Sequence, residues 1–160
     1  MKVLVVEDDA RTAQMIRANL SSDNHVVELA EDGNDASFLA RSFNYDAIIL
    51  DNSLPKKDGL TICKEIRAIG KSTPILFLTI DNSLETKINA FKYGADDFMS
   101  KPFSLQELNM RLKVILKRNQ TNEKTTIKVG DLEMDTDKRI VSRAGKKIRM
   151  TKKEFILLEY

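Results

Sequence analysis

The segment AIILDNSLP, residues 47–55, is the stretch from which the fold can be worked out. An apolar run leads directly into an acid, Asp51, and a short turn then ends at Pro55. A short continuous apolar run bounded by a turn is typical of a strand that is covered on both faces. The question is why such a buried strand should end in a carboxylate.

Strand-like and helix-like segments alternate five times before residue 118. The expected strands are 2–6, 25–29, 46–50, 74–78 and 96–100. The expected helices, with apolar residues at helical spacing, are 11–20, 33–43, 58–69, 83–94 and 104–118. Short connections between alternating elements, together with strands that are apolar throughout, predict an α/β fold with a five-stranded, doubly wound parallel sheet.

The residues that follow four of these strands carry chemically useful side chains. In a doubly wound sheet, ligands lie beyond the carboxyl ends of the strands, so we expect these side chains to meet at one edge. Taken in strand order they are Glu7 and Asp8, Asp51, Thr79, and Lys101. Each alone has an ordinary explanation, as a strand terminator or a turn residue. Their joint placement predicts a functional site.

Clustered carboxylates repel one another unless a cation lies among them. A hard divalent ion, Mg²⁺ or Mn²⁺, suits a set of carboxylate oxygens. The Lys101 ammonium and the Thr79 hydroxyl would leave room for one more anion, and a phosphoryl group fits that description. Asp51 would then be the nucleophile and would form an aspartyl phosphate. The strand ends in an acid because that carboxylate must stand at the exposed rim.

Other classes of protein remain open at this point. A phosphatase with an aspartate nucleophile needs a second Asp two positions later, where this chain has Ser53. A nucleotide- or flavin-binding module needs a phosphate loop after the first strand, where this chain has acids. A module that only dimerises or binds partners, independently of phosphorylation or DNA, also fits the sequence.

Composition narrows the class further. The 160 residues are 42% hydrophobic and 31% charged, with a net charge of +2. No apolar run is long enough to span a bilayer, and the N-terminus turns acidic too early for a signal peptide. Cys63 is the single cysteine, so no internal disulfide can form. These features favour a cytoplasmic protein.

Four motifs together resemble the receiver domain of two-component response regulators. They are VLVVEDD, AIILDNSLPKKDG, PILFLT and GADDFMSKPFS, and the likeness covers residues 1–118. It implies the CheY/flavodoxin-like strand order 2-1-3-4-5, and a phosphoacceptor that is not a turnover enzyme. Asp51 would accept phosphate from a sensor histidine kinase.

The resemblance also implies roles for individual residues. Asp8, Asp51 and the backbone carbonyl of Ser53 would contact the metal, and Glu7 would act through water. Thr79 and Lys101 would be the switch and phosphate-pairing residues, and Phe98 stands where the family often has a switching Tyr. The Lys101–Pro102 peptide is expected to be cis. Ile80 departs from the pattern because the residue after Thr79 is usually small, and we expect Ile80 to slow phosphorylation or to shield the acyl phosphate.

The C-terminal region follows a different pattern. Residues 119–126 are polar and lack periodicity, which predicts a linker. Residues 127–160 read as short antiparallel strands followed by a helix that starts at the capping box of Thr151 and Glu154. This region resembles the start of the winged-helix DNA-binding domain of OmpR/PhoB-type regulators, cut short at Tyr160. We therefore expect DNA control in the intact protein and no specific DNA binding by this chain.

The same subfamily implies a homodimer through the 84–118 face. By analogy, three ion pairs would cross the two-fold axis: Lys87 with Glu107, Asp97 with Arg111, and Asp96 with Arg118. Without the resemblance, these residues would be ordinary exposed charges, each pair contributing roughly 0–1 kcal/mol.

Overall fold

The computed structural model describes residues 1–124, 126–135, 140–148, 150–151 and 154. For residues 118–124, 126, 127 and 135 it describes the backbone alone. The chain forms two compact units, Met1–Leu116 and Lys117–Tyr160, and each is considered by itself below.

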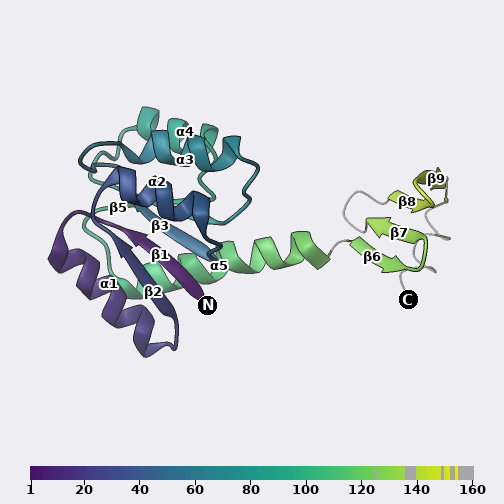
Figure 1. Cartoon of the computed structure of the whole chain (residues 1–160), viewed down its shortest axis with the longest axis horizontal. Coiled ribbons are helices and arrows are strands. Elements are labelled where there is room, and N and C mark those ends of the chain that lie inside the picture. Colours follow the sequence, from purple (N-terminus) through teal and green to yellow (C-terminus); the bar gives the residue numbers. More distant parts are fainter. Residues whose placement is uncertain (125, 136–139, 149, 152–153, 155–160) are drawn as a thin grey trace. The chain divides into compact units, whose positions relative to one another are not determined.

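The first unit is a five-stranded parallel sheet with helices on both faces (Figure 1). The strand order is β2-β1-β3-β4-β5, which confirms the predicted topology. The strands are β1 Lys2–Val6, β2 Val26–Ala30, β3 Ala47–Asp51, β4 Ile75–Thr79 and β5 Asp97–Ser100. The helices are α1 Ala10–Ser22, α2 Gly33–Ser42, α3 Gly59–Ala68, α4 Leu84–Lys92 and α5 Leu105–Lys124.

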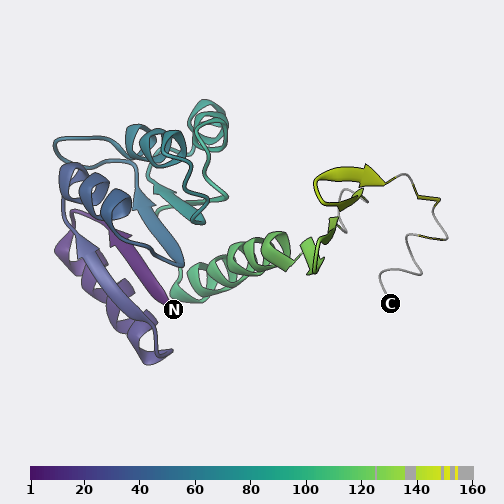
Figure 2. The same ribbon diagram turned by 45° about the vertical axis from the view of Figure 1, so that its right-hand side comes forward.

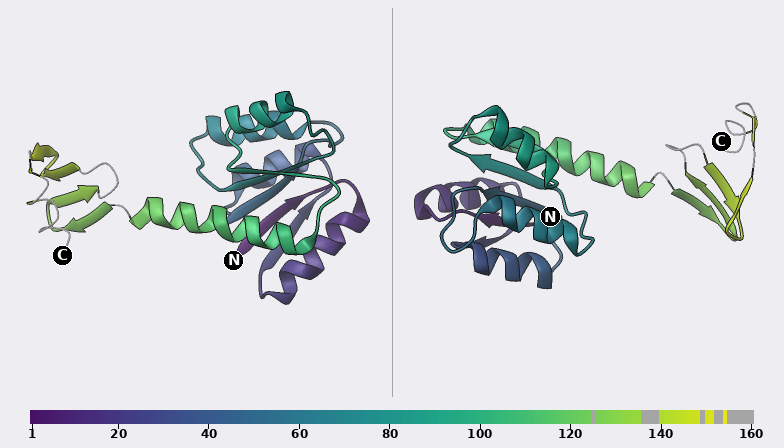
Figure 3. Two further views of the ribbon diagram at one scale, coloured as in Figure 1. Left: turned by 180° about the vertical axis from the view of Figure 1, so that it is seen from behind. Right: turned by 90° about the horizontal axis from the view of Figure 1, so that it is seen from above.

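Alternation along the strands explains why they are apolar throughout. Side chains such as Leu50 and Phe77 enter one core together with residues of α2, α3 and α4. Their neighbours Ile49 and Leu76 enter a second core with residues of α1 and α5. Both layers are visible from behind and from above in Figure 3. Because both faces are covered, the polar side chains of β1, β3, β4 and β5 are confined to the strand ends, while the edge strand β2 carries Glu28 at its centre.

Side chains of the connecting loops start the first four helices. Asp9, Asp32, Asp58 and Ser83 are the N-caps of α1 to α4, and each accepts a hydrogen bond from a backbone N–H in the first turn. Such caps satisfy donors that a helix leaves open, and each contributes about 1 kcal/mol. They fix the loops that leave the carboxyl ends of the strands.

The last helix is longer than the sequence indicated. The apolar spacing predicted an end at residue 118, but α5 continues to Lys124 through most of the expected polar linker. The polar part has no apolar face to reveal a helix by periodicity. Within the described residues, no helix is both long and apolar enough to cross a membrane. The turned view in Figure 2 follows α5 along its length.

The second unit contains the predicted antiparallel strands. Its sheet has the order β6-β7-β8-β9, with the strands Thr126–Val129, Leu132–Asp135, Ile140–Arg143 and Lys146–Ile148. A small cluster of Met134 and Val141, with Leu132 and Met150 packed on it, forms its core. The capping box is present, because the Thr151 N–H donates to the Glu154 carboxylate at 2.8 Å. The helix expected beyond it lies outside the described residues.

Candidate functional site

Four strand ends bring the predicted residues together. Glu7 and Lys101 directly follow β1 and β5, while Asp51 and Thr79 are the last residues of β3 and β4. Because the strands are parallel and in register, all four lie at one edge of the sheet. Glu7 is 1% exposed, Asp51 2% and Thr79 1%, whereas Asp8 is exposed.

The Lys101 ammonium is the centre of the site. It lies 2.7 Å and 2.9 Å from the two Glu7 carboxylate oxygens and 3.0 Å from Oδ2 of Asp51. Burial by itself would lower the pKa of Lys101, but the hydrogen bonds and charges of the two acids raise its pKa above the ordinary value. The side chain is therefore a permanent cation at physiological pH.

Glu7 is under opposing influences. Burial raises the pKa of its carboxyl group, and the hydrogen bond from Lys101 lowers it, while the nearby Asp51 charge raises it again. The net direction is upward. One ammonium therefore does not fully compensate two buried acids, and an additional positive charge would stabilise the site.

The acidic residues form a set of oxygen donors suited to such a charge. Glu7, Asp8 and Asp51 each offer one carboxylate oxygen, and these oxygens lie within 4.8 Å of one another. Carboxylate oxygens with one open, exposed side are the ligands that Mg²⁺ prefers. Ser53, whose backbone carbonyl was predicted to contact the metal, lies in the loop just after Asp51 and is exposed.

Thr79 is fixed to the loop that follows β4. Its hydroxyl oxygen accepts a hydrogen bond from the Asp81 backbone N–H at 3.1 Å. Its carbonyl oxygen accepts one from the Lys101 backbone N–H at 2.8 Å. The Asp81 carboxylate in turn accepts from the Ser83 N–H and the Thr86 hydroxyl at the start of α4. A displacement of the Thr79 side chain can therefore be transmitted through Asp81 to the start of α4.

The loop after β3 packs tightly behind Asp51. A Cβ atom at Gly59 would lie 2.3 Å from the Asp51 carbonyl oxygen, so this position requires glycine. The Asp51 carboxylate accepts a hydrogen bond from the Asn52 N–H at 2.8 Å. On the other side of the site the Lys101–Pro102 peptide is cis, as expected.

Two further predicted residues lie near the rim. Phe98 is 9% exposed, and the Lys87 ammonium lies 5.4 Å from the centroid of its ring. Ile80 is 72% exposed, so its side chain stands at the mouth of the site rather than in the core. It lines a groove with Met15 and Pro102 beside Lys101.

The predicted dimer residues have partners within the chain. Arg111 contacts Asp97 at 3.0 Å and Glu107 at 2.9 Å. Asp96 accepts from Arg67 at 2.9 Å. The side chain of Arg118 lies outside the described residues. The two-fold pairing of these charges therefore stays a prediction.

Sequence reasoning missed two contacts. The direct ion pair of Glu7 with Lys101 was not expected, since Glu7 was assigned a metal contact through water. Arg67 was also missed: it donates to the carbonyls of Gly94, Lys71 and Thr73 as well as to Asp96. In the sequence it is simply an arginine one residue before the end of α3, and no spacing rule predicts its contacts.

Comparison with known proteins adds a family to this geometry. A model described as "Response regulator receiver domain" matches residues 3–113. The chain is 40% identical over 161 residues to the "Probable transcriptional regulatory protein SilR" of Salmonella typhimurium, covering 100% of this chain and 71% of that protein.

Solved structures agree with this match. Response regulator DrrB, an OmpR/PhoB homologue from Thermotoga maritima, is 32% identical with a TM-score of 0.67, covering 99% of this chain and 70% of that one. The receiver domain of the sensor histidine kinase PA1611 from Pseudomonas aeruginosa is 35% identical with a TM-score of 0.67, covering 72% of this chain and 97% of that one. The latter structure has a magnesium ion coordinated in its active-site cleft.

Proposed function

Since the chain belongs to the response regulator receiver domain family, we propose that Asp51 is the residue that accepts the phosphoryl group. The observation that supports this most directly is the placement of Lys101, which follows β5 and lies 3.0 Å from the carboxylate of Asp51 at the end of β3. A nucleophile, a cation and a hydroxyl at one rim are the parts that phosphoryl transfer needs.

The transfer uses the side chains in distinct roles. An Asp51 oxygen attacks phosphorus, a new P–O bond forms, and the bond from phosphorus to the donor imidazole breaks as the imidazole keeps the electron pair. The Lys101 ammonium moves from the carboxylates to a phosphoryl oxygen and balances its charge. The Thr79 hydroxyl, which accepts one hydrogen bond, can still donate another to the phosphoryl group.

Mg²⁺ fits the site, with Asp8, Asp51 and the Ser53 carbonyl as its proposed ligands and Glu7 acting through water. When bound, the ion would neutralise the charge shared by the acids and the incoming phosphoryl group. Glu7 and Asp51 are already held by Lys101, so the chain presents preformed oxygens at the rim. We propose a phosphoacceptor with slow self-hydrolysis and not a turnover enzyme.

We propose that the donor histidine belongs to another protein. His25 is the single histidine of the chain, and it lies at the turn between α1 and β2, not among the site residues. A groove of about 360 Å³ next to Lys101, lined by Met15, Ile80 and Phe103 among others, offers an apolar seat beside the site. We propose a sensor histidine kinase as this partner, and a cytoplasmic location for the exchange.

The output would be a homodimer that controls transcription. Exposed apolar side chains lie on α4 at Leu84, Ile88 and Phe91, and on α5 at Met110 and Val114. We propose that this 84–118 face pairs about a two-fold axis after phosphorylation. The domains would be a receiver over 1–118, a connection over 119–126, and part of a winged-helix effector over 127–160, with specific DNA binding a property of the intact protein.

A direct experiment tests the nucleophile. The chain is incubated with Mg²⁺ and acetyl phosphate, and mass spectrometry follows the addition of one phosphoryl group. We expect an acid-stable, base-labile adduct that is absent in Asp51→Asn. The control is Asp23→Asn, at the exposed C-terminal end of α1, where the adduct should still form. An adduct that persists in Asp51→Asn would overturn the assignment. Transcriptional output independent of this adduct would favour a receiver that acts only as an interaction module.

A further inference from the structure

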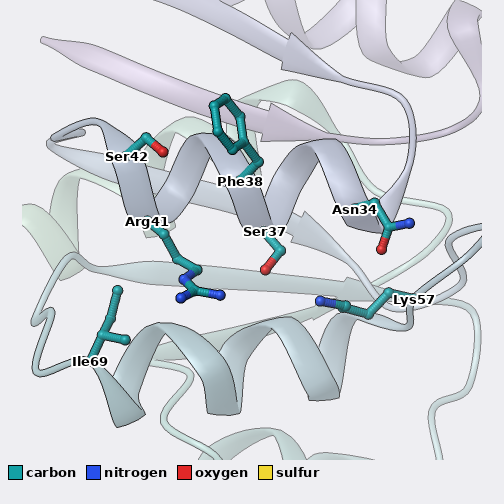
Figure 4. Close-up of a pocket in the computed structure, with 7 residues that line it drawn as sticks. All are labelled: Asn34, Ser37, Phe38, Arg41, Ser42, Lys57 and Ile69. Carbon is teal, nitrogen blue, oxygen red and sulfur yellow. The ribbon is translucent and has the colours of Figure 1, made fainter.

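A second concave surface lies away from the phosphorylation site, between α2 and α3. It is a groove of about 620 Å³ lined by residues of α2 from Asn34 to Ser42, with Lys57 and Ile69. Figure 4 shows the Arg41 guanidinium and the Lys57 ammonium pointing into the groove from opposite ends, with the Ser37 hydroxyl between them. Two cations from separate segments of the chain therefore converge here.

One of the two cations is already compensated. Lys57 contacts both Glu65 carboxylate oxygens at 2.9 Å, and the buried Ser37 hydroxyl donates to Glu65 at 2.5 Å. These contacts hold the pKa of Glu65 below its ordinary value, with Ser37 contributing most and the Arg41 charge least. Glu65 is thus a carboxylate fixed by Lys57 and Ser37.

Arg41 is in a different position. Across the part of the chain that the structure describes, its guanidinium has no ion-pair or hydrogen-bond partner. The next cation, Lys71, donates to the carbonyls of Ala40 and Phe43 and so offsets the partial negative charge at the end of α2. An anion approaching Arg41 would therefore not be repelled by that helix end.

Exposed apolar side chains border the same groove. Phe38 is 64% exposed and Ile69 45%, and both line the groove. A free small anion could occupy the space near Arg41 but would leave these two side chains in water. A peptide can cover apolar surface and supply a carboxylate at the same time, so the surroundings favour a macromolecular occupant.

We propose that the α2/α3 groove binds an acidic segment of a partner protein, with a carboxylate on Arg41 and an apolar side chain against Ile69. A guanidinium with all its donors free matches a carboxylate in a bidentate geometry. Lys57 and Glu65 compensate each other at the other end of the groove, so Arg41 supplies the charge that the carboxylate would meet. This surface is separate from the dimer face and from the groove beside Lys101.

The groove also contacts the loop between β3 and α3, which directly follows Asp51 and contains Lys57. The Pro55 carbonyl accepts hydrogen bonds from Gly33, at the start of α2, and from Lys57. A Cβ at Gly33 would lie 2.0 Å from the Lys57 carbonyl oxygen, so loop and helix are in direct contact. A partner on the groove would therefore contact the loop that follows the phosphoacceptor.

The test uses the full chain labelled with ¹⁵N and a blocked peptide, Glu-Glu-Leu-Glu-Glu, titrated at low ionic strength. We expect saturable amide shifts centred on Ser37, Arg41 and Ile69, weakening as salt is added. Arg41→Gln, which removes no hydrogen bond or ion pair among the described residues, is expected to bind about fivefold more weakly. Lys113→Gln, an exposed cation on α5, is the matched control and should bind as the wild type does.

Any of four results would overturn the proposal. One is equal binding by Arg41→Gln and the wild type. Another is a set of shifts centred on Lys101 instead of the groove. The third is a response to inorganic phosphate at Arg41 with none to the peptide, which would identify a small-anion site. The Gln-Gln-Leu-Gln-Gln peptide separates charge from apolar contact, and binding equal to that of the acidic peptide would contradict the role of Arg41.

Discussion

The Lys101 ammonium lies 3.0 Å from Oδ2 of Asp51, and the same ammonium is held still closer by Glu7, at 2.7 Å. Glu7 and Asp51, which are both almost fully buried, thus share one cation. A phosphoryl group on Asp51 would bring further negative charge, so the cation must leave Glu7 at least in part. Glu7 therefore influences how readily Lys101 is released to the phosphoryl group.

The first prediction concerns Lys101. Lys101→Ala removes the only ammonium among the described residues that contacts Asp51, so the transition state loses a stabilising charge. We expect phosphorylation by acetyl phosphate to slow by about tenfold or more, since loss of a single donor to a developing anion commonly costs more than that. Lys101→Arg keeps the charge but not the compact shape, so its phosphorylation rate should lie between those of the wild type and Lys101→Ala. Rates follow from intact-protein mass spectrometry, and an unchanged rate in Lys101→Ala would remove Lys101 from the mechanism.

The second prediction concerns the metal. Mg²⁺ should raise the unfolding temperature, because it binds the folded set of Glu7, Asp8 and Asp51 and not the unfolded chain. Asp8→Asn removes one of these ligands at an exposed position and should weaken Mg²⁺ binding by about tenfold. Asp23→Asn serves as the control. Scanning calorimetry with Mg²⁺ or with a chelator gives the shift, and an equal shift in Asp8→Asn and the wild type would contradict the assigned site.

The sequence predicted the sheet and most of the site because both depend on local, repeating features. Apolar runs mark strands covered on both faces, and a residue just after such a run must lie at the strand end. Asp51, Thr79 and Lys101 could be placed together for that reason alone. The strand order itself needed the family resemblance.

The contacts of Lys101 and Arg67 depend on long-range geometry, and the C-terminal part of α5 lacks the apolar spacing that indicates a helix. The Lys101 contact with Glu7 is set by how far one flexible side chain reaches from the end of β5, past β4 and β3, to the end of β1. Arg67 binds four groups from two loops, one before β4 and one before β5, and no periodicity in the sequence indicates such contacts. The polar end of α5 is helical without an apolar face, so spacing rules ended the helix at residue 118 and not at Lys124.

The third prediction concerns Ile80. Its side chain stands at the mouth of the site beside Lys101, where it narrows access for both the phosphodonor and water. Ile80→Ala should speed phosphorylation by acetyl phosphate and hydrolysis of the product, each by about threefold or more, which is roughly 0.7 kcal/mol in the barrier. Met15→Ala, on the other wall of the groove, controls for a general loss of apolar surface. If both rates stay at the wild-type values, Ile80 does not control access.

The fourth prediction concerns pH and the pair of Lys57 with Glu65. The pKa of Glu65 is lowered from 4.5, mainly by the Ser37 hydroxyl and then by Lys57. A carboxyl group with a depressed pKa in the folded state stabilises the protein fully above its unfolded pKa, and loses this contribution as the pH falls through the folded value. Glu65→Gln should therefore be less stable than the wild type by about 1 kcal/mol at neutral pH.

The pH dependence separates charge from packing in that variant. The difference between wild type and Glu65→Gln should shrink once the pH drops below 4.5 and the wild-type carboxyl takes up its proton. Urea unfolding at a series of pH values measures it. Exposed Glu31→Gln should show no such trend, and a gap that stays constant down to acid pH would mean that the shape of Glu65, not its charge, stabilises the fold.

The last prediction concerns the dimer face and tests which of its charges are free to pair. Ile88 and Phe91 are 56% and 51% exposed on α4, so Ile88→Asp should prevent dimer formation in acetyl phosphate and Mg²⁺, measured by light scattering after gel filtration. Val26→Asp, on the opposite edge strand and 65% exposed, is the matched control and should still dimerise.

The two acids of the proposed face differ in their partners. Asp96 accepts from Arg67 and from the Ile75 N–H, which lie outside the 84–118 face, whereas Asp97 accepts from Arg111, which lies within it. Asp96→Asn should therefore act mainly on stability and lower the free energy of unfolding. Arg111→Ala should act mainly on association and weaken the dimer. A dimer that survives Ile88→Asp would move the interface off α4, and a dimer lost in Asp96→Asn at unchanged stability would show that Arg67 does not retain this carboxylate.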